Sequence, residues 1–191
     1  NSGNLYLIDA VGGGPGKLTL NGSNGFYDGR MEIGTGTELI AASAINFSGS
    51  QIINNGLINS PDLNFAGGTI QSLNGTGTIT SVTINNTNGI ELPDGDQTIT
   101  NRLEFGAGAG KLITNANKIS LAAAVGVTIP GVSETAYIQG NLERFFNPGN
   151  STLDFLIGDG SNKFAPVTIA VNNAQPGCAF TFSTTPNDRN N

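Results

Sequence analysis

The sequence predicts an all-β protein: a right-handed parallel β-solenoid (β-helix) over residues 1–130, followed by a small antiparallel β subdomain over residues 131–191. Three observations lead to this fold class. The composition disfavours helices, turn signals are frequent, and short apolar–polar–apolar segments recur along the first two thirds of the chain. Recurrence at about 20 residues is typical of solenoids and other repeat architectures.

The composition argues against both helices and disorder. Of 191 residues, 28 are Gly, 25 are Asn and 19 are Thr, and these poor helix formers interrupt nearly every apolar run. Asn-Gly pairs occur at 21–22, 24–25, 55–56, 74–75 and 88–89, and each is a tight-turn signal because both residues tolerate left-handed backbone angles. The regularly placed Ile, Leu, Val and Phe residues are unlike the composition of disordered segments.

The first set of predicted strands consists of three-residue segments with two apolar side chains on either side of a polar one. Such a triplet is a half-buried strand that turns two side chains inward and one outward. The starts of successive triplets are unevenly spaced, and the two shortest steps come first. The triplets are Leu18–Leu20, Met31–Ile33, Ile45–Phe47, Leu63–Phe65, Val82–Ile84, Leu103–Phe105 and Ile119–Leu121.

A second set of strands precedes the triplets in the middle of the chain, centred on Ile58, Ile79, Ile99 and Ile113. One unit therefore reads strand, polar corner, strand and Gly-rich return. A unit of this size cannot bury its own apolar face, but stacked units share a continuous apolar column. The alternative is an antiparallel β-sandwich, which also has short strands with turns every 8–12 residues or so.

After about residue 130 the strands become longer and alternate more regularly between apolar and polar residues. This pattern predicts an antiparallel subdomain that covers one end of the solenoid, where a bare terminal rung would expose unpaired N–H and C=O groups. The predicted strands lie within 136–144, 151–157, 166–171 and 179–183.

The same composition excludes several chemistries. The chain has no His, which rules out a Ser-His-Asp triad, a Cys-His dyad and a His-liganded zinc site. Its single Cys cannot form an intrachain disulfide. A net charge of −6 with only 8 Lys and Arg argues against a nucleic-acid-binding surface, and no stretch approaches the ~18 apolar residues of a membrane span.

Three segments near the C-terminus resemble a module of large repetitive secreted surface proteins of Bacteroidota-type bacteria. They are Tyr137-Ile-Gln-Gly-Asn-Leu-Glu-Arg144, Phe155-Leu-Ile-Gly-Asp-Gly160 and Ala165-Pro-Val-Thr-Ile169. The upstream repeats are similar to filamentous-haemagglutinin-type adhesin repeats. The resemblance implies export, an extracellular or cell-surface location and an adhesive or structural role within a longer chain; it transfers no catalytic residues.

Two groups of residues are candidate sites. Asp94 and Asp96 lie in a Pro/Gly turn, where closely spaced carboxylates could hold Ca²⁺, although a solvated turn is the favoured interpretation. Arg144, Phe145 and Phe146 could form a contact patch for a neighbouring module, and edge packing inside the subdomain explains them equally well. We expect no other cofactor.

The resulting hypothesis is a non-catalytic extracellular scaffold that assembles with neighbouring copies or modules, end to end into a fibre in one variant. Outward Asn, Thr and Ser side chains could bind glycans, and the Thr-Ile-Thr segments at 78–80 and 98–100 could stack their Thr side chains on adjacent rungs. The alternative function is a polysaccharide lyase or hydrolase on a β-helix scaffold. Its raw material would be Glu32, Glu91, Asp94, Asp96 and Glu104, with Arg30 and Arg102.

Overall fold

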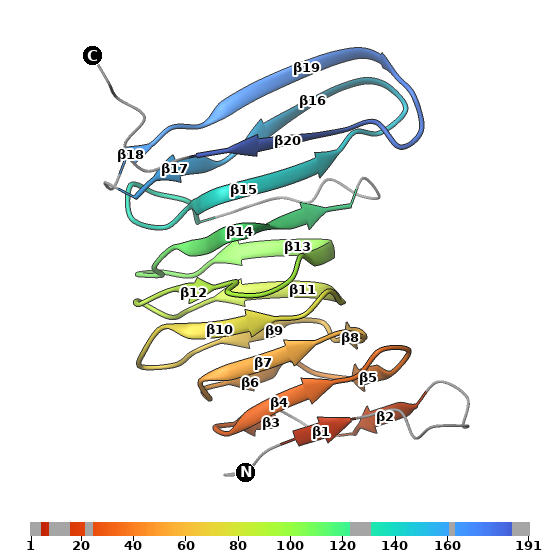
Figure 1. The fold of residues 1–191 in the computed structure, drawn as a ribbon, viewed down its shortest axis with the longest axis vertical. Helices are drawn as coiled ribbons and strands as arrows, with labels where there is room; N and C mark the ends of the chain where they lie inside the picture. Colours follow the sequence, from red (N-terminus) through yellow and green to blue (C-terminus); the bar gives the residue numbers. More distant parts are fainter. Residues whose placement is uncertain (1–4, 8–15, 22–24, 123–130, 161–162, 185–191) are drawn as a thin grey trace.

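A computed structural model describes residues 5–7, 16–21, 25–122, 131–160 and 163–184. These residues form a β-solenoid of about six turns, in which parallel strands stack along one axis from β1, β2 and β3 to β15 (Figure 1). The predicted solenoid is confirmed, and the antiparallel-sandwich alternative is wrong, because the stacked strands pair in parallel. No helix long and apolar enough to cross a membrane occurs among these residues.

The stacked strands form three faces. The first face contains β1 (Leu5–Leu7), β4 (Arg30–Ile33), β7 (Gln51–Asn54), β10 (Gln71–Asn74), β12 (Ile90–Glu91), the first parts of β14 (Leu112–Leu121) and β15 (Ile138–Phe145), and β17 (Ile157–Asp159). The second face contains β2 (Lys17–Leu20), β5 (Glu38–Ala41), β8 (Leu57–Asn59), the first parts of β11 (Thr78–Ile84) and β13 (Gln97–Phe105), and the last parts of β14 and β15. The third face contains β3 (Gly25–Tyr27), β6 (Ile45–Phe47), β9 (Leu63–Phe65) and the last parts of β11 and β13.

The true repeat is one full turn around these faces. Met31 pairs with Ile52, and Ile52 pairs with Leu73, so successive partners on the first face lie one turn apart in the chain. The triplets that start at Ile45, Leu63, Val82 and Leu103 do stack on one another, all on the third face. The earlier ones do not: Leu18 lies on the second face and Met31 on the first, which explains the short first steps.

The core is a set of apolar columns that run along the axis inside the faces. On the second face Leu39, Ile58, Ile79, Ile99 and Leu121 pair in succession, and each is buried. On the third face, the rings of Phe47 and Phe65 meet edge to face with their centroids 6.0 Å apart. Because every rung adds the same kind of side chain at the same place, the core grows by stacking rather than by closing into a globule.

Buried amides hold the corners between the first and second faces. Gln97 is fully buried, and its Nε2 donates to the carbonyl oxygens of Asn54, Asn74 and Gly75 at 2.6–3.1 Å. Asn54, also fully buried, donates from Nδ2 to Gln97 Oε1 at 3.0 Å. Turns leave backbone carbonyls without strand partners, and a buried carbonyl needs a donor. These side chains supply that donor over three consecutive rungs.

Glycine is required where corners of adjacent rungs touch. Gly75 has φ +90°, and its N–H donates to the carbonyl of Asp94 in the next rung at 2.8 Å. A Cβ on buried Gly49 would lie 1.8 Å from the carbonyl oxygen of Gly29, so the two corners stack only without a side chain. The predicted left-handed turns at 74–75 and 88–89 are confirmed, since Gly89 also has a positive φ. The chain bends at 55–56 too, but Gly56 has no positive φ, and the pairs at 21–22 and 24–25 fall partly outside the described residues.

Parallel stacking continues beyond residue 130 and ends at β15 and β17. There β20 (Ala179–Ser183) pairs antiparallel with β15, and β18 (Lys163–Phe164) pairs antiparallel with β17. A separate hairpin of β16 (Gly149–Phe155) and β19 (Val167–Ala174) lies at the same end, at the top of Figure 1. Phe155 and Ala174 from this hairpin join the buried core. The predicted small antiparallel sheet is thus confirmed, although β15 and β17, within the segment 131–191 that was expected to be antiparallel, still pair in parallel with the solenoid.

Candidate functional site

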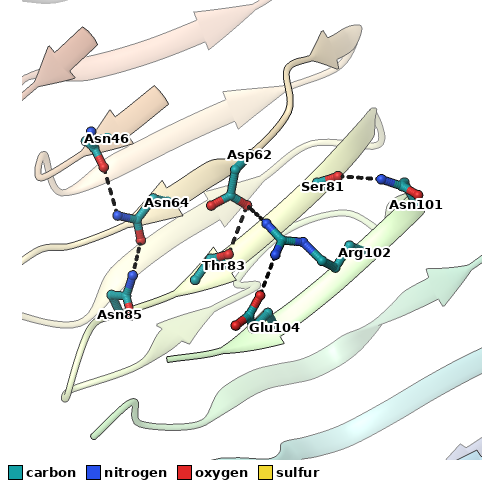
Figure 2. Close-up of polar contacts among 9 residues, drawn as sticks. All are labelled: Asn46, Asp62, Asn64, Ser81, Thr83, Asn85, Asn101, Arg102 and Glu104. Carbon is teal, nitrogen blue, oxygen red and sulfur yellow. Dashed lines mark hydrogen bonds and ion pairs between the residues drawn. The ribbon is translucent and has the colours of Figure 1, made fainter. Parts of the chain in front are cut away.

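The outward positions of the second and third faces carry polar side chains that are matched from rung to rung. On the third face, Asn64 Nδ2 donates to Asn46 Oδ1 at 2.8 Å, and Asn85 Nδ2 donates to Asn64 Oδ1 at 2.7 Å (Figure 2). Each amide is both donor and acceptor, so a stacked row of them satisfies itself along the axis. The row fixes the side chains in one orientation on the surface.

Beside this amide row, two carboxylates share one guanidinium. Arg102 lies 3.1 Å from Asp62 through Nη2 and 2.5 Å from Glu104 through Nη1, as Figure 2 shows. Thr83 Oγ1 also donates to Asp62 at 2.9 Å. Burial raises the pKa of the Asp62 carboxyl above its usual value, although the bonds from Thr83 and Arg102 act in the opposite direction. Asp62 is not among the residues that the sequence indicated, because there it resembles any residue of a polar corner.

On the second face, Glu143 is the centre of a second polar cluster. Its carboxylate accepts bonds from Lys118 Nζ at 2.8 Å, Ser120 Oγ at 2.7 Å and Thr181 Oγ1 at 3.3 Å. Burial alone would raise the pKa of Glu143, but these bonds outweigh it and the net shift is downward. Glu143, on β15, is therefore a charged acceptor held by side chains of the two neighbouring strands, β14 and β20.

A hollow of about 330 Å³ opens on the second face next to this cluster. It is lined by Thr98, Ser120, Ala122, Glu143 and Phe145. Leu121 pairs with Arg144, so the residues that follow them, Ala122 and Phe145, share the outward side of adjacent rungs. The hollow exists because Ala122 has a methyl group where its neighbour has an aromatic ring.

A second hollow, of about 410 Å³, lies farther along the same face, at the corner before β5, β8 and β11. Its lining repeats a short glycine-containing segment in three consecutive rungs. It consists of Gly36, Thr37, Glu38, Asn55, Gly56, Leu57, Thr76, Gly77 and Thr78. Gly56 and Gly77 let the rungs stack closely at this corner, because a Cβ on either would lie within 2.6 Å of atoms in the preceding rung.

Asp94 and Asp96, the residues considered for Ca²⁺, lie in an exposed turn around Gly95, which has φ +86°. Asp96 Oδ1 accepts a bond from the backbone N–H of Lys118 in the next rung at 2.9 Å, and the backbone carbonyl of Asp94 accepts the N–H of Gly75. Both residues therefore connect corners of adjacent rungs. Over the described residues, no three His, Cys, Asp or Glu side chains gather in a way that could hold a metal ion.

The three residues of the candidate contact patch point in different directions. Arg144 is buried on the inner side of the last rung, where its Nη1 donates to the carbonyl of Asp154 at 2.6 Å and burial lowers its pKa. Phe146 is also buried and meets Phe180 edge to face. Phe145 alone lies on the outward side and lines the hollow. The sequence could have indicated this arrangement, since residues two apart share one side of a strand. The buried side is formed by Leu142, Arg144 and Phe146.

Among the carboxylates and arginines considered for an enzyme, the structure brings some into pairs on single strands. Arg30 binds Glu32 at 2.8 Å, as Arg102 binds Glu104. Glu91 accepts a bond from Ser72 of the adjacent rung at 3.2 Å. The predicted stacking of Thr78 on Thr98 is confirmed by their register.

Comparison of the chain with family models, curated proteins and solved structures finds no match.

Proposed function

We propose that this chain is a non-catalytic, extracellular structural or adhesive module that presents ordered polar faces on a rigid β-solenoid. The observation that carries the proposal is the row of Asn46, Asn64 and Asn85, together with the clusters around Arg102 and Glu143. Each of these side chains is already held by a bond to an adjacent rung. Side chains fixed before binding lose little conformational entropy on contact, which favours recognition of another polar surface.

Glycans are the class of partner that such faces fit. Amides, hydroxyls and carboxylates at successive rungs, ~4.8 Å apart, offer donors and acceptors in a regular array. A polymer of hydroxyl-bearing units could contact several rungs at once, and weak contacts at each rung would add through multivalency. The resemblance to repetitive surface proteins supports an extracellular location.

Assembly with a neighbouring copy or module would use the end formed by β1, β2 and β3, and an end-to-end fibre would also require displacement of β20 from the opposite end. At the opposite end, β20 already occupies the edge of β15 on the second face. Among the described residues, the strands of the first rung pair only with β4, β5 and β6 on their inner side. Their remaining edges have the geometry to accept further parallel strands.

Binding to an array of neutral and anionic oligosaccharides tests the adhesive role, and electron micrographs of the purified chain test the fibre. We expect glycan binding that falls when Asn64 is replaced by Leu, because this change breaks the amide row in the middle. Asn150→Leu, on the β16–β19 hairpin, is the control. Absence of glycan binding across the array, together with monomeric particles, would overturn the proposal.

The carboxylates around Arg102 support a second candidate, a polysaccharide lyase or hydrolase. Burial raises the pKa of Asp62, and the Arg102 guanidinium holds the Asp62 and Glu104 carboxylates close together, as an acid–base pair needs. An assay of new chain ends distinguishes an enzyme from a scaffold. The chain is incubated with anionic and neutral polysaccharides, with and without Ca²⁺, before the assay. Cleavage that is lost in Glu104→Gln would favour the enzyme; intact polymer favours the scaffold.

A further inference from the structure

The hollow beside Phe145 is lined by both apolar and polar residues. One wall is apolar and consists of the Phe145 ring and the Ala122 methyl group. The other wall consists of Thr98, Ser120 and Glu143, three residues with polar side chains that pair in succession on adjacent rungs. Its volume of about 330 Å³ is at the lower end of the range for small-ligand sites.

The polar wall is fixed before any ligand arrives. Ser120 Oγ donates to Glu143 at 2.7 Å, and Lys118 Nζ and Thr181 Oγ1 bind the same carboxylate. A carboxylate that accepts several bonds still has lone pairs for one more donor. The hydroxyl of Ser120, which donates to Glu143, keeps its own oxygen as an acceptor. The wall thus offers a ligand two acceptors, the Glu143 carboxylate and Ser120 Oγ, together with the hydroxyl of Thr98.

The charge of this site narrows the choice of ligand. Glu143 is ionised, because its bonds hold its pKa below the usual value, and Lys118 neutralises it at 2.8 Å. A charged ligand would compete with this ion pair, whereas a neutral one would not. The ligand must instead supply hydroxyls to one wall and an apolar face to the ring on the other.

We propose that this hollow is a binding subsite for one neutral pyranose unit of a glycan, with one face of the sugar ring against Phe145 and its hydroxyls toward Ser120 and Glu143. This inference rests on the proposed adhesive function and adds a sugar contact on the second face, separate from the row of Asn46, Asn64 and Asn85 on the third face. The aliphatic C–H face of a pyranose is the neutral apolar surface that an aromatic ring accepts, and its edge carries hydroxyls.

The same face offers a path for the rest of a glycan chain. Thr98, which lines the hollow, pairs with Thr78, which lines the corner hollow near β5, β8 and β11. Thr78 in turn pairs with Leu57, and Leu57 with Glu38. The row from Glu143 to Glu38 covers five rung steps, about 24 Å at ~4.8 Å per step. A tetrasaccharide should therefore bind more tightly than a single sugar.

The test uses the whole chain and a panel of neutral probes: glucose, mannose, galactose and N-acetylglucosamine, each as the monosaccharide and as a linear tetramer, with polygalacturonate as the anionic comparison. Binding is followed by isothermal titration and by amide shifts in two-dimensional NMR. We expect a neutral tetramer to bind and to shift the amides of Thr98, Ser120, Ala122, Glu143 and Phe145.

Ala122→Leu fills the hollow without touching the polar wall and is expected to weaken binding at least tenfold. The control is Ala42→Leu, the same change at an exposed residue after β5, which should leave affinity unchanged. Both variants must melt at the temperature of the native chain. Glu143→Gln, which keeps the shape but loses the charge and one acceptor, should weaken binding several-fold.

Three results would overturn the subsite. If a glycan binds but Ala122→Leu and Glu143→Gln leave its affinity unchanged, with shifts elsewhere, the hollow is wrong and the adhesive function stands. If polygalacturonate alone binds, the neutral-ligand argument fails. If nothing on the panel binds, both the subsite and the adhesive role fall.

Discussion

Replacement of Gln97 by Met tests whether buried amides stabilise the corners of the solenoid. Met keeps the length and approximate volume of the side chain but removes the amide, so no large cavity forms. The carbonyls of Asn54, Asn74 and Gly75 lose a donor, and Asn54 Nδ2 loses an acceptor. These groups are fully or largely buried, so water cannot replace the lost partners without opening the corner.

The expected loss follows from how many groups stay unpartnered. The Asn54 carbonyl keeps the Gly77 N–H at 2.8 Å, and Asn54 Nδ2 keeps the Thr78 carbonyl at 3.2 Å. Two carbonyls, those of Asn74 and Gly75, lose the bond from Gln97 outright. At roughly 1–2 kcal/mol for each buried polar group left unsatisfied, the free energy of unfolding should fall by about 3 kcal/mol.

Urea unfolding followed by circular dichroism measures this loss, and hydrogen exchange locates it. The amides near Gly75 and Gly95, which stack at this corner, should exchange faster in the variant. Gln51→Met, the same change at a half-exposed residue of β7, is the matched control and should shift stability by no more than about 0.5 kcal/mol. Equal effects of the two substitutions would refute the role of the buried amide.

Three further predictions concern corners, charge and the covered end. Gly49→Ala should lower the free energy of unfolding by about 1–3 kcal/mol in urea titrations, because the new Cβ would meet the Gly29 carbonyl. Gly68→Ala, which has open space around it, is the control and should not lower the free energy of unfolding. Comparable losses in the two variants would contradict the stacking argument. Because the folded state lowers the pKa of Glu143, its contribution is complete above the ordinary carboxyl pKa of about 4.5 and is lost as pH falls through the lower folded value. Acid titration of Glu143→Gln should show a shallower decline, and an unchanged profile would contradict this. A chain ending at residue 177 lacks β20, so its β15 edge is exposed and light scattering should detect oligomers. A chain ending at residue 184 keeps β20 and should have the same molecular mass in solution as the native chain. Identical masses for the two truncated chains would show that β20 does not protect the edge.

The fold class could be predicted from the sequence because the repeat consists of apolar residues that recur at similar spacing along the chain. Ile58, Ile79 and Ile99 stack as their spacing predicts. Ile113 does not join them; it lies on the first face, opposite Glu91. Similar triplets occur on all three faces, and a triplet alone does not say which face it occupies. Assignment to a face needs the length of every corner, which varies along this chain.

The candidate site was harder to predict because it depends on neighbours that lie a full turn of the solenoid apart in the chain. The sequence indicated Phe145 together with Arg144, yet the two lie on opposite sides of β15. Nothing in the sequence around Ala122 indicates a site, because Ala122 helps to line the hollow only through its position beside Phe145. The buried amide of Gln97 likewise resembles a surface residue until the carbonyls of the corner below are placed around it.

The order of rungs along the axis is also the order of synthesis. Each new rung contacts rungs that have already been made, so a chain synthesised from its N-terminus can add rungs progressively without waiting for later segments. The edge of β15 is the exception, because its partner β20 emerges only after the whole β16–β19 hairpin has been made. Over the described residues, vectorial folding is therefore completed by β20, which pairs with the edge of β15 and leaves no room there for a further strand.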